Sequence, residues 1–223
     1  MIDKYYEYSD DKQKCKYDIV VEGCRSCLFE TLCHYENMKK KQKEKSDLYS
    51  FSKKKCDICQ RYIDSHLYKI HHNSHPTEIF KWLYLGSFAN ACDLSELRRL
   101  KIDHILNCAF ECKNKNLPKD IKEMHLKIKD YDNFNLIDYF EESNRFINKC
   151  RLEGGKILVH CKFGISRSVS LIIAYLIKHN KYTSEDAFEF IRQKRYQINP
   201  NEGFMEQLYK YEKIINNRNH LNT

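Results

Sequence analysis

The sequence predicts an α/β fold, in which a twisted central sheet is flanked by helices and preceded by a small Cys/His-rich module. Two observations support this prediction. From Ile79 onward, segments with strand and helix periodicity alternate along the chain. Before that point, cysteines and histidines crowd into a stretch without sustained apolar periodicity. We therefore divide the 223 residues into a module (1–76), a larger domain (77–216) and a tail (217–223).

The first half of the larger domain alternates between the two periodicities. Its expected elements are strand 82–85, helix 91–100, strand 104–108, loop 112–118, strand 123–128 and helix 137–151. In the first helix, Leu94, Leu97 and Leu100 lie at helical spacing and form one apolar face. We expect Gly86 to turn the chain out of the first strand and Gly154 to end the second helix.

The second half begins with the apolar segment 157–161, which predicts a buried strand. A loop with one glycine follows, and residues 167–177 then have the apolar spacing of a helix. Thr183 is a suitable N-cap for a helix over 185–195. The turn at Asn199 leads into a last helix, whose inward residues we expect to be Met205, Leu208, Tyr211 and Ile214.

The strand, loop and helix around Cys161 form a candidate anion site. Backbone N–H groups of a tight loop and the N-terminus of the following helix converge on one point, where they bind phosphate. Arg167 can hold two phosphate oxygens in a bidentate pair. In such an electropositive setting a cysteine is favoured as the thiolate, which is the nucleophilic form. This layout suits transfer of a phosphoryl group to sulfur.

The sequence His-Cys-x-x-Gly-x-x-Arg-Ser at residues 160–168 resembles the phosphate loop of cysteine-based protein phosphatases. Its last five residues, Gly-Ile-Ser-Arg-Ser, look like the dual-specificity branch. Segments 83–87, 105–107, 134–136 and 199–208 resemble the same family, so the likeness covers about residues 78–214. It implies a dual specificity protein phosphatase, which hydrolyses phosphotyrosine and phosphoserine or phosphothreonine through a phosphocysteine intermediate.

The resemblance also implies individual roles. Cys161 is the expected nucleophile, Arg167 the phosphate ligand and Asp130 the general acid, with Asp132 as its rival. Ser168 is expected to hydrogen-bond the departing thiolate. The phosphate-binding residues are expected to be Lys162, Phe163, Gly164, Ile165, Ser166 and Arg167, supported by His160 and Asn201. The chemistry needs no cofactor. Related lipid phosphatases carry lysine where this chain has Ile165, which favours phosphoproteins over phosphoinositides.

The N-terminal module carries two groups of potential metal ligands. Cys56, Cys59, His71 and His75 follow the spacing Cys-x2-Cys-x11-His-x3-His, one residue short of the usual zinc-finger spacing. His72 could replace His71, and Ile63 and Leu67 could form a small core. The other group consists of Cys24, Cys27 and Cys33, with Cys15 or His34 as a fourth ligand. We expect structural zinc; separate sites, interleaved ligands or free thiols all remain open.

Composition narrows the class of protein further. The net charge of +8 suits an anionic substrate without requiring nucleic acid. No apolar run approaches the roughly 18 residues of a membrane span, and the N-terminus lacks the apolar core of a signal peptide. We therefore expect an intracellular protein, cytoplasmic or nuclear, whose eleven cysteines serve metal binding and catalysis rather than disulfides.

Phosphoproteins are the expected partners of this chain, whereas the partner of residues 1–76 stays unknown. Two alternatives were weighed against the enzyme: a phosphoprotein-binding scaffold with little turnover, and an RNA-directed phosphatase or binder. Retention of Cys161, Arg167 and a candidate acid argues against the scaffold. The lysine-rich run 39–45 is more typical of a solvated segment than of a nucleic-acid contact.

Overall fold

A computed structural model describes residues 52–114 and 116–221 of the chain. The expected ligand group Cys24, Cys27 and Cys33, with Cys15 or His34, lies outside these residues, as does the run 39–45. Along the described part of the chain, strands and helices alternate in the order that the sequence predicts for an α/β fold.

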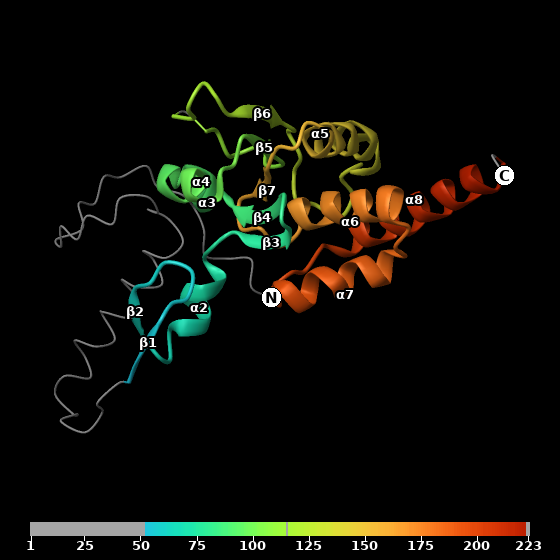
Figure 1. Ribbon diagram of the computed structural model, residues 1–223. Coiled ribbons are helices and arrows are strands. Elements are labelled where there is room, and N and C mark those ends of the chain that lie inside the picture. The colour runs from blue at the N-terminus through green and yellow to red at the C-terminus, as the bar shows by residue number, and fades with distance from the viewer. Residues whose placement is uncertain (1–51, 115, 222–223) are drawn as a thin grey trace.

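The elements keep the labels of Figure 1. The strands are β1 (Lys53–Lys55), β2 (Tyr62–Asp64), β3 (Thr77–Phe80), β4 (Leu83–Ser87), β5 (His104–Asn107), β6 (Lys122–His125) and β7 (Ile157–Cys161). The helices are α2 (Tyr68–Asn73), α3 (Phe88–Cys92), α4 (Leu94–Leu100), η1 (Ile137–Tyr139), α5 (Phe140–Leu152), α6 (Arg167–Asn180), α7 (Ser184–Lys194) and α8 (Glu202–Leu221).

The central sheet has five strands in the order β3-β4-β7-β5-β6. Strand β7 lies in the middle and pairs in parallel with β4 and with β5, while β3 adds an antiparallel edge to β4. Helices cover both faces of the sheet (Figure 1). This arrangement confirms the α/β class, and it brings the carboxyl ends of β4, β5 and β7 to one edge.

The inner strands β4, β5 and β7 are buried on both faces, and alternate residues therefore enter different cores. Ile157 and Val159 belong to the larger core, which α5, α6, α7 and α8 cover, whereas Leu158 belongs to a smaller core under α3 and α4. The alternation continues to the end of β7. Cys161 therefore lies with the larger core, and the His160 ring lies 6.1 Å from that of Phe88 in α3.

Three sequence-based expectations about the elements need correction. The expected helix 91–100 is two helices, because Asp93 ends α3 and then caps α4 through the Glu96 N–H (3.0 Å). Strand β3 was not expected, because its pairing with β4 is a tertiary contact. Toward the end of α8 Ile215 is buried while Ile214 is 40% exposed, because Ile215 continues at helical spacing the row of buried Phe204, Leu208 and Tyr211.

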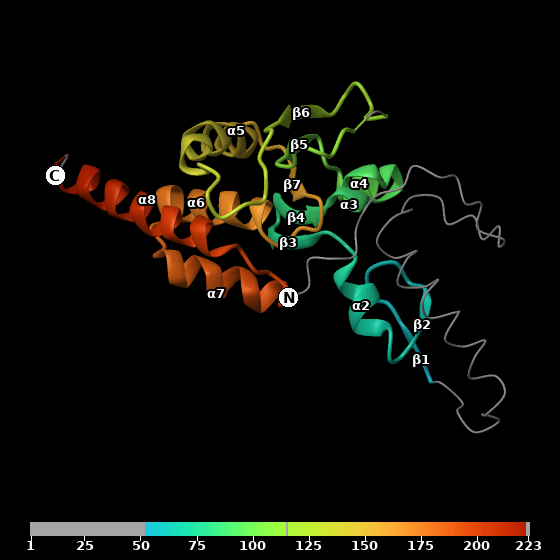
Figure 2. The same ribbon diagram turned by 180° about the vertical axis from the view of Figure 1, so that it is seen from behind.

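Residues 52–76 form a small unit beside the sheet. Strands β1 and β2 pair as an antiparallel hairpin, and α2 packs next to it. In both views this unit lies below α3 and α4, at the opposite end of the molecule from the C-terminus of α8 (Figure 2). Within residues 52–114 and 116–221, no helix has both the length and the apolarity that crossing a bilayer requires.

Candidate functional site

The sulfur atom of Cys161 lies at the end of the central strand β7, where the chain turns into the phosphate-loop segment 162–166. The Cys161 side chain is buried, with 1% of its surface exposed. Its Sγ accepts a hydrogen bond from the Gly164 N–H (3.2 Å) and another from the Ser168 hydroxyl (3.3 Å). Both contacts stabilise negative charge on sulfur.

Gly164 can take its place in the loop only because it has no side chain. Its φ is +70°, and an added Cβ would lie 2.5 Å from the Gly86 carbonyl oxygen at the end of β4. The loop is also joined to the start of α3, directly after β4, by a hydrogen bond from the Phe88 N–H to the Lys162 carbonyl (3.2 Å). The neighbouring strand thus determines how closely the loop folds over the sulfur.

Arg167 begins α6 and is held by a carboxylate that the sequence analysis did not identify. Its two terminal nitrogens donate to the two Glu111 carboxylate oxygens, each at 2.8 Å. A third bond reaches the Ile128 carbonyl (3.2 Å). Burial opposes the charged guanidinium, but the bonds to Glu111 keep the pKa of Arg167 above its usual value. The pKa of Glu111 is lowered by the same pair, against the effect of its own burial.

Asp130 reaches the phosphate loop from the segment after β6. One carboxylate oxygen accepts from the Ser166 hydroxyl (2.7 Å) and from the Asn201 side-chain amide (3.0 Å). The other lies 3.3 Å from Arg167 Nε as an ion pair, without the alignment of a hydrogen bond. Asp132 is exposed and does not line the pocket. The structure therefore places Asp130, and not its rival, in the wall of the pocket that Cys161 also lines.

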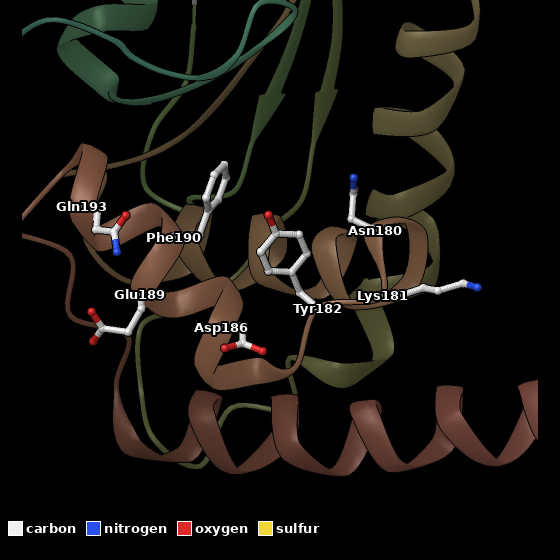
Figure 3. Close-up of a pocket in the computed structure, with 7 residues that line it drawn as sticks. All are labelled: Asn180, Lys181, Tyr182, Asp186, Glu189, Phe190 and Gln193. Atoms are coloured by element: carbon white, nitrogen blue, oxygen red, sulfur yellow. The ribbon is translucent and has the colours of Figure 1, made fainter.

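These side chains surround a cavity of about 240 Å³, which is lined by Asp130, Cys161, Phe163, Ile165, Ser166, Arg167, Asn199 and Asn201. Lys162 does not line it; its ammonium lies over the Phe163 ring, 5.1 Å from the centroid. A larger hollow of about 450 Å³ between the end of α6 and α7 holds Lys181, Asp186 and Glu189, whose side chains point apart (Figure 3). No cysteine, serine or arginine lines that hollow.

His160 lies outside the pocket and Asn201 lies in its wall, and both contact the residues of this constellation. Burial lowers the pKa of His160 to about 4, so the ring is neutral at physiological pH and orients the loop without carrying charge. Its Nε2 lies 3.3 Å from the Asn114 amide. Asn201 makes two kinds of contact. It caps α8 by accepting from the Phe204 N–H (2.9 Å), and it holds Asp130.

A second constellation lies in the small unit. The ligand atoms of Cys56, Cys59, His71 and His75 all lie within 4.8 Å of one another. Cys56 Sγ is 3.7 Å from His75 Nε2, Cys59 Sγ is 3.2 Å from His71 Nε2, and the two Nε2 atoms are 3.4 Å apart. Tetrahedral zinc would separate such ligands by roughly 3.3–3.8 Å. The spacing therefore fits one zinc ion.

The surroundings of this group resolve which histidine belongs to it. His72 Nε2 instead faces Asp57 at 3.3 Å, which leaves His71 as the histidine that joins the two cysteines and His75. The Nδ1 atom of His75 lies 3.6 Å from Glu96, which Arg99 holds in turn with bonds of 2.7 and 2.8 Å. A carboxylate behind a ligating histidine is a common feature of zinc sites, because it fixes the ring.

Another cluster, Asp103, His104 and Cys150, also has donor atoms within 4.8 Å of one another. Its carboxylate is already occupied. Asp103 Oδ1 lies 2.6 Å from His104 Nδ1 and accepts from the Lys156 N–H at 2.9 Å. This cluster serves to join β5 to the start of β7 rather than to form an open metal site.

Two functional residues escaped the sequence analysis. Glu111 follows the end of β5, at the sheet edge where Cys161 lies, so its position after a strand was a usable signal. Arg195 is 2% exposed and donates to the Gly164 carbonyl (3.1 Å) from the loop between α7 and α8. Nothing in the sequence around Arg195 predicts burial, because an arginine at the end of a helix is usually solvated.

Comparison with known proteins identifies the family. Residues 83–214 match the dual specificity phosphatase catalytic domain. A Slingshot protein phosphatase homologue from Xenopus laevis is 42% identical over 140 residues, which is 63% of this chain and 20% of that protein. A probable rhodanese domain-containing dual specificity phosphatase from Dictyostelium discoideum is 42% identical over 142 residues, or 63% of this chain and 30% of that protein.

Among solved structures, the human tyrosine phosphatase-like serine/threonine/tyrosine-interacting protein superposes with a TM-score of 0.60 and 34% identity, covering 63% of this chain and 97% of that one. The chain belongs to the dual specificity phosphatase family, as the phosphate loop and the fold together indicate. It spans less than a third of the length of the two curated relatives above. The match begins after residues 52–76, which the family does not explain.

The start of α8 provides a test of how tightly the Asp130 segment is held. Gly203 lies directly against it, since an added Cβ would be 1.9 Å from the Asp132 carbonyl oxygen. Gly203→Ala should therefore force the segment away and destabilise the fold by about 1–3 kcal/mol, as overpacking does. Urea unfolding measures this, with the exposed Glu206→Ala in the same helix as control. Equal unfolding free energies for the two variants would contradict the close packing.

Proposed function

We propose that this chain is a phosphoprotein phosphatase that removes phosphate from tyrosine, serine and threonine through a phosphocysteine. The single observation that supports this most is the joint placement of Cys161, Arg167 and Asp130 around one pocket. A nucleophile, an anion ligand and a proton donor are the three groups that this chemistry needs. Membership of the dual specificity family supports the same conclusion.

In the first step, the Cys161 thiolate attacks phosphorus, and the bond from phosphorus to the substrate oxygen breaks. Loop N–H groups and the Arg167 guanidinium hold the three equatorial oxygens, whose charge they balance in the transition state. Asp130, in its protonated form, gives its proton to the leaving oxygen. The products of this step are the dephosphorylated side chain and phosphocysteine.

In the second step, water attacks the phosphocysteine. Asp130, now ionised, takes a proton from that water, while the bond from phosphorus to sulfur breaks. The Ser168 hydroxyl, 3.3 Å from Sγ, donates a hydrogen bond to the thiolate as it leaves. Inorganic phosphate departs, and both Cys161 and Asp130 return to their starting forms. The cycle consumes one water and uses no metal or other cofactor.

The pocket favours phosphoproteins over phosphoinositides. Its wall carries apolar Ile165 and Phe163, and the Lys162 side chain lies outside it, so the loop offers no second cation for an inositol phosphate. The cavity has a volume of only about 240 Å³, so a phosphate carried on a short serine or threonine side chain can also reach Cys161. This supports activity on all three phosphorylated residues.

We also propose that Cys56, Cys59, His71 and His75 bind structural zinc. Their donor types and separations support this, together with the Glu96 carboxylate behind His75. A second zinc bound by Cys24, Cys27 and Cys33 remains a proposal from spacing alone. An intracellular location, cytoplasmic or nuclear, suits a thiolate enzyme, and every cysteine among the described residues is free of disulfide bonds.

Cys161→Ser tests the proposed function. This variant should lose turnover of a phosphopeptide and of an aryl phosphate while it still binds inorganic phosphate, because the amides and Arg167 remain. Steady-state assays and calorimetry measure the two properties, and Cys92→Ser, at an exposed cysteine, is the control. Turnover in Cys161→Ser within about tenfold of the parent would refute the assignment. Phosphopeptide binding without turnover in the parent would support the scaffold.

Asp130→Asn should lower kcat about 10²–10⁴-fold for alkyl phosphates, whose leaving oxygen needs a proton. The loss should be smaller for nitrophenyl phosphate, because nitrophenolate leaves without protonation. Kinetics on both substrates measure the difference, and Asp132→Asn is the matched control two residues away. If Asp132→Asn showed the selective loss and Asp130→Asn did not, the assignment of the acid would be wrong.

The purified chain should contain at least one zinc per molecule by elemental analysis. Cys59→Ser should lower that content by one, because it removes a ligand, whereas Cys92→Ser should not. A structural zinc contributes roughly 10–16 kcal/mol of folding free energy at pH 7 in small domains. Residues 52–76 should therefore become sensitive to protease when zinc is removed. A metal-free chain with this segment still protected would contradict the proposal.

A further inference from the structure

Arg195 joins the small unit to the phosphate loop through neutral oxygen atoms on both sides. Toward the loop, its Nε donates to the Gly164 carbonyl (3.1 Å), and a terminal nitrogen donates to the Phe163 carbonyl (3.5 Å). Toward the small unit, its other terminal nitrogen donates to Thr77 Oγ1 (3.1 Å) and the His75 carbonyl (3.4 Å). One buried guanidinium thus contacts both constellations described above.

The contact with Phe163 acts directly on the sulfur site. The Phe163 carbonyl and the Gly164 N–H belong to the same peptide group, and that N–H donates to Cys161 Sγ at 3.2 Å. Because a peptide group is planar and trans, its carbonyl and N–H point in opposite directions. Holding the carbonyl outward therefore keeps the N–H turned toward the sulfur, where an anion would bind.

Arg195 depends strongly on its acceptors. Burial lowers the pKa of its guanidinium to about 10, which still leaves it charged at neutral pH. A buried charged donor that loses an acceptor is costly, so the side chain or its surroundings would rearrange. Loss of the oxygens of His75 and Thr77 is therefore expected to disturb the contacts on the loop side as well.

Of the two oxygens on the far side, the His75 carbonyl belongs to the segment that the proposed zinc would fix, and Thr77 begins β3 two residues later. His75 is itself one of the four ligands. The preceding residue, Ser74, accepts a hydrogen bond from the Asn90 side chain (2.6 Å), and Asn90 also accepts from the Ser87 N–H (2.8 Å) at the end of β4. Metal binding would hold the His75 backbone in place against the catalytic domain.

We propose that the Cys2His2 unit is a structural part of the active site, and that Arg195 is the positioning residue which makes phosphate binding depend on the bound metal. This rests on the proposed zinc site and the proposed phosphatase activity. The metal takes no part in the chemistry. The metal determines how well the Gly164 N–H points at the anion. Removal of the metal therefore weakens phosphate binding more than it lowers kcat, the rate at which bound substrate reacts.

The test measures the inhibition constant for inorganic phosphate and the kcat and KM for nitrophenyl phosphate in the full chain, before and after zinc removal. Nitrophenyl phosphate is small, which separates loop alignment from recognition of a protein substrate. In the parent, zinc removal should raise KM and the inhibition constant by at least about fivefold, the lower end of usual coupling between sites. The change in kcat should be smaller.

Arg195→Gln should show the raised constants with zinc still bound, and zinc removal should then change them less than twofold. The matched control is Arg192→Gln in α7, where the arginine is exposed and pairs with Glu189. It should respond to zinc removal as the parent does. If Arg195→Gln does not fold, Thr77→Val removes one acceptor at nearly constant shape and should reduce the response to zinc.

The outcomes separate this proposal from the earlier ones. Absence of zinc from every sample would refute the metal site. An inactive parent would refute the phosphatase activity. In that case calorimetry of phosphate binding to Cys161→Ser, with and without zinc, would still measure whether the metal affects phosphate binding. If the parent contains zinc but its KM and its inhibition constant for phosphate stay the same after zinc removal, the proposed coupling is wrong. Additive effects of zinc removal and Arg195→Gln would overturn Arg195 as its route.

Discussion

The active site depends on backbone N–H groups aimed at one sulfur atom at the end of β7. Amides can point inward only if the carbonyls of the same peptide groups point outward and find donors there. Arg195 supplies such a donor to the loop, and Gly164 allows the chain to pass within van der Waals distance of β4. The close approach of strand, loop and helix is therefore a requirement of the anion site itself.

Charge balance around Arg167 is the second constraint. A guanidinium that is 3% exposed must be paired, and Glu111 and Asp130 provide two carboxylates on different sides of it. The bidentate bond to Glu111 fixes the plane of the guanidinium. The guanidinium is therefore already oriented toward the pocket before phosphate binds. Such preorganisation avoids the cost of ordering the side chain during binding.

The small unit gains its order from two sources. Ligand atoms from a hairpin and a short helix meet at one point, and residues 74–77 are tied to the catalytic domain through Asn90, Glu96 and Arg195. Because the same residues approach the phosphate loop, the unit is placed to affect catalysis without touching the substrate. The sequence left open whether the module packs against the catalytic domain, and residues 74–77 do contact it.

The sequence alone determined the class of fold and the phosphate-loop motif with Cys161 and Arg167, because strand periodicity, the glycine loop and the Cys–Arg spacing are local features. It also narrowed the candidate acid to a segment of three residues. Only tertiary structure decided that Asp130 rather than Asp132 lines the pocket, that His71 rather than His72 joins the Cys/His group, and that Glu111 and Arg195 contact the phosphate loop or its arginine. Each of these depends on which distant backbone or side chain comes within about 3 Å. Residue spacing along the chain does not reveal these long-range contacts, because they follow from how the sheet and helices pack together.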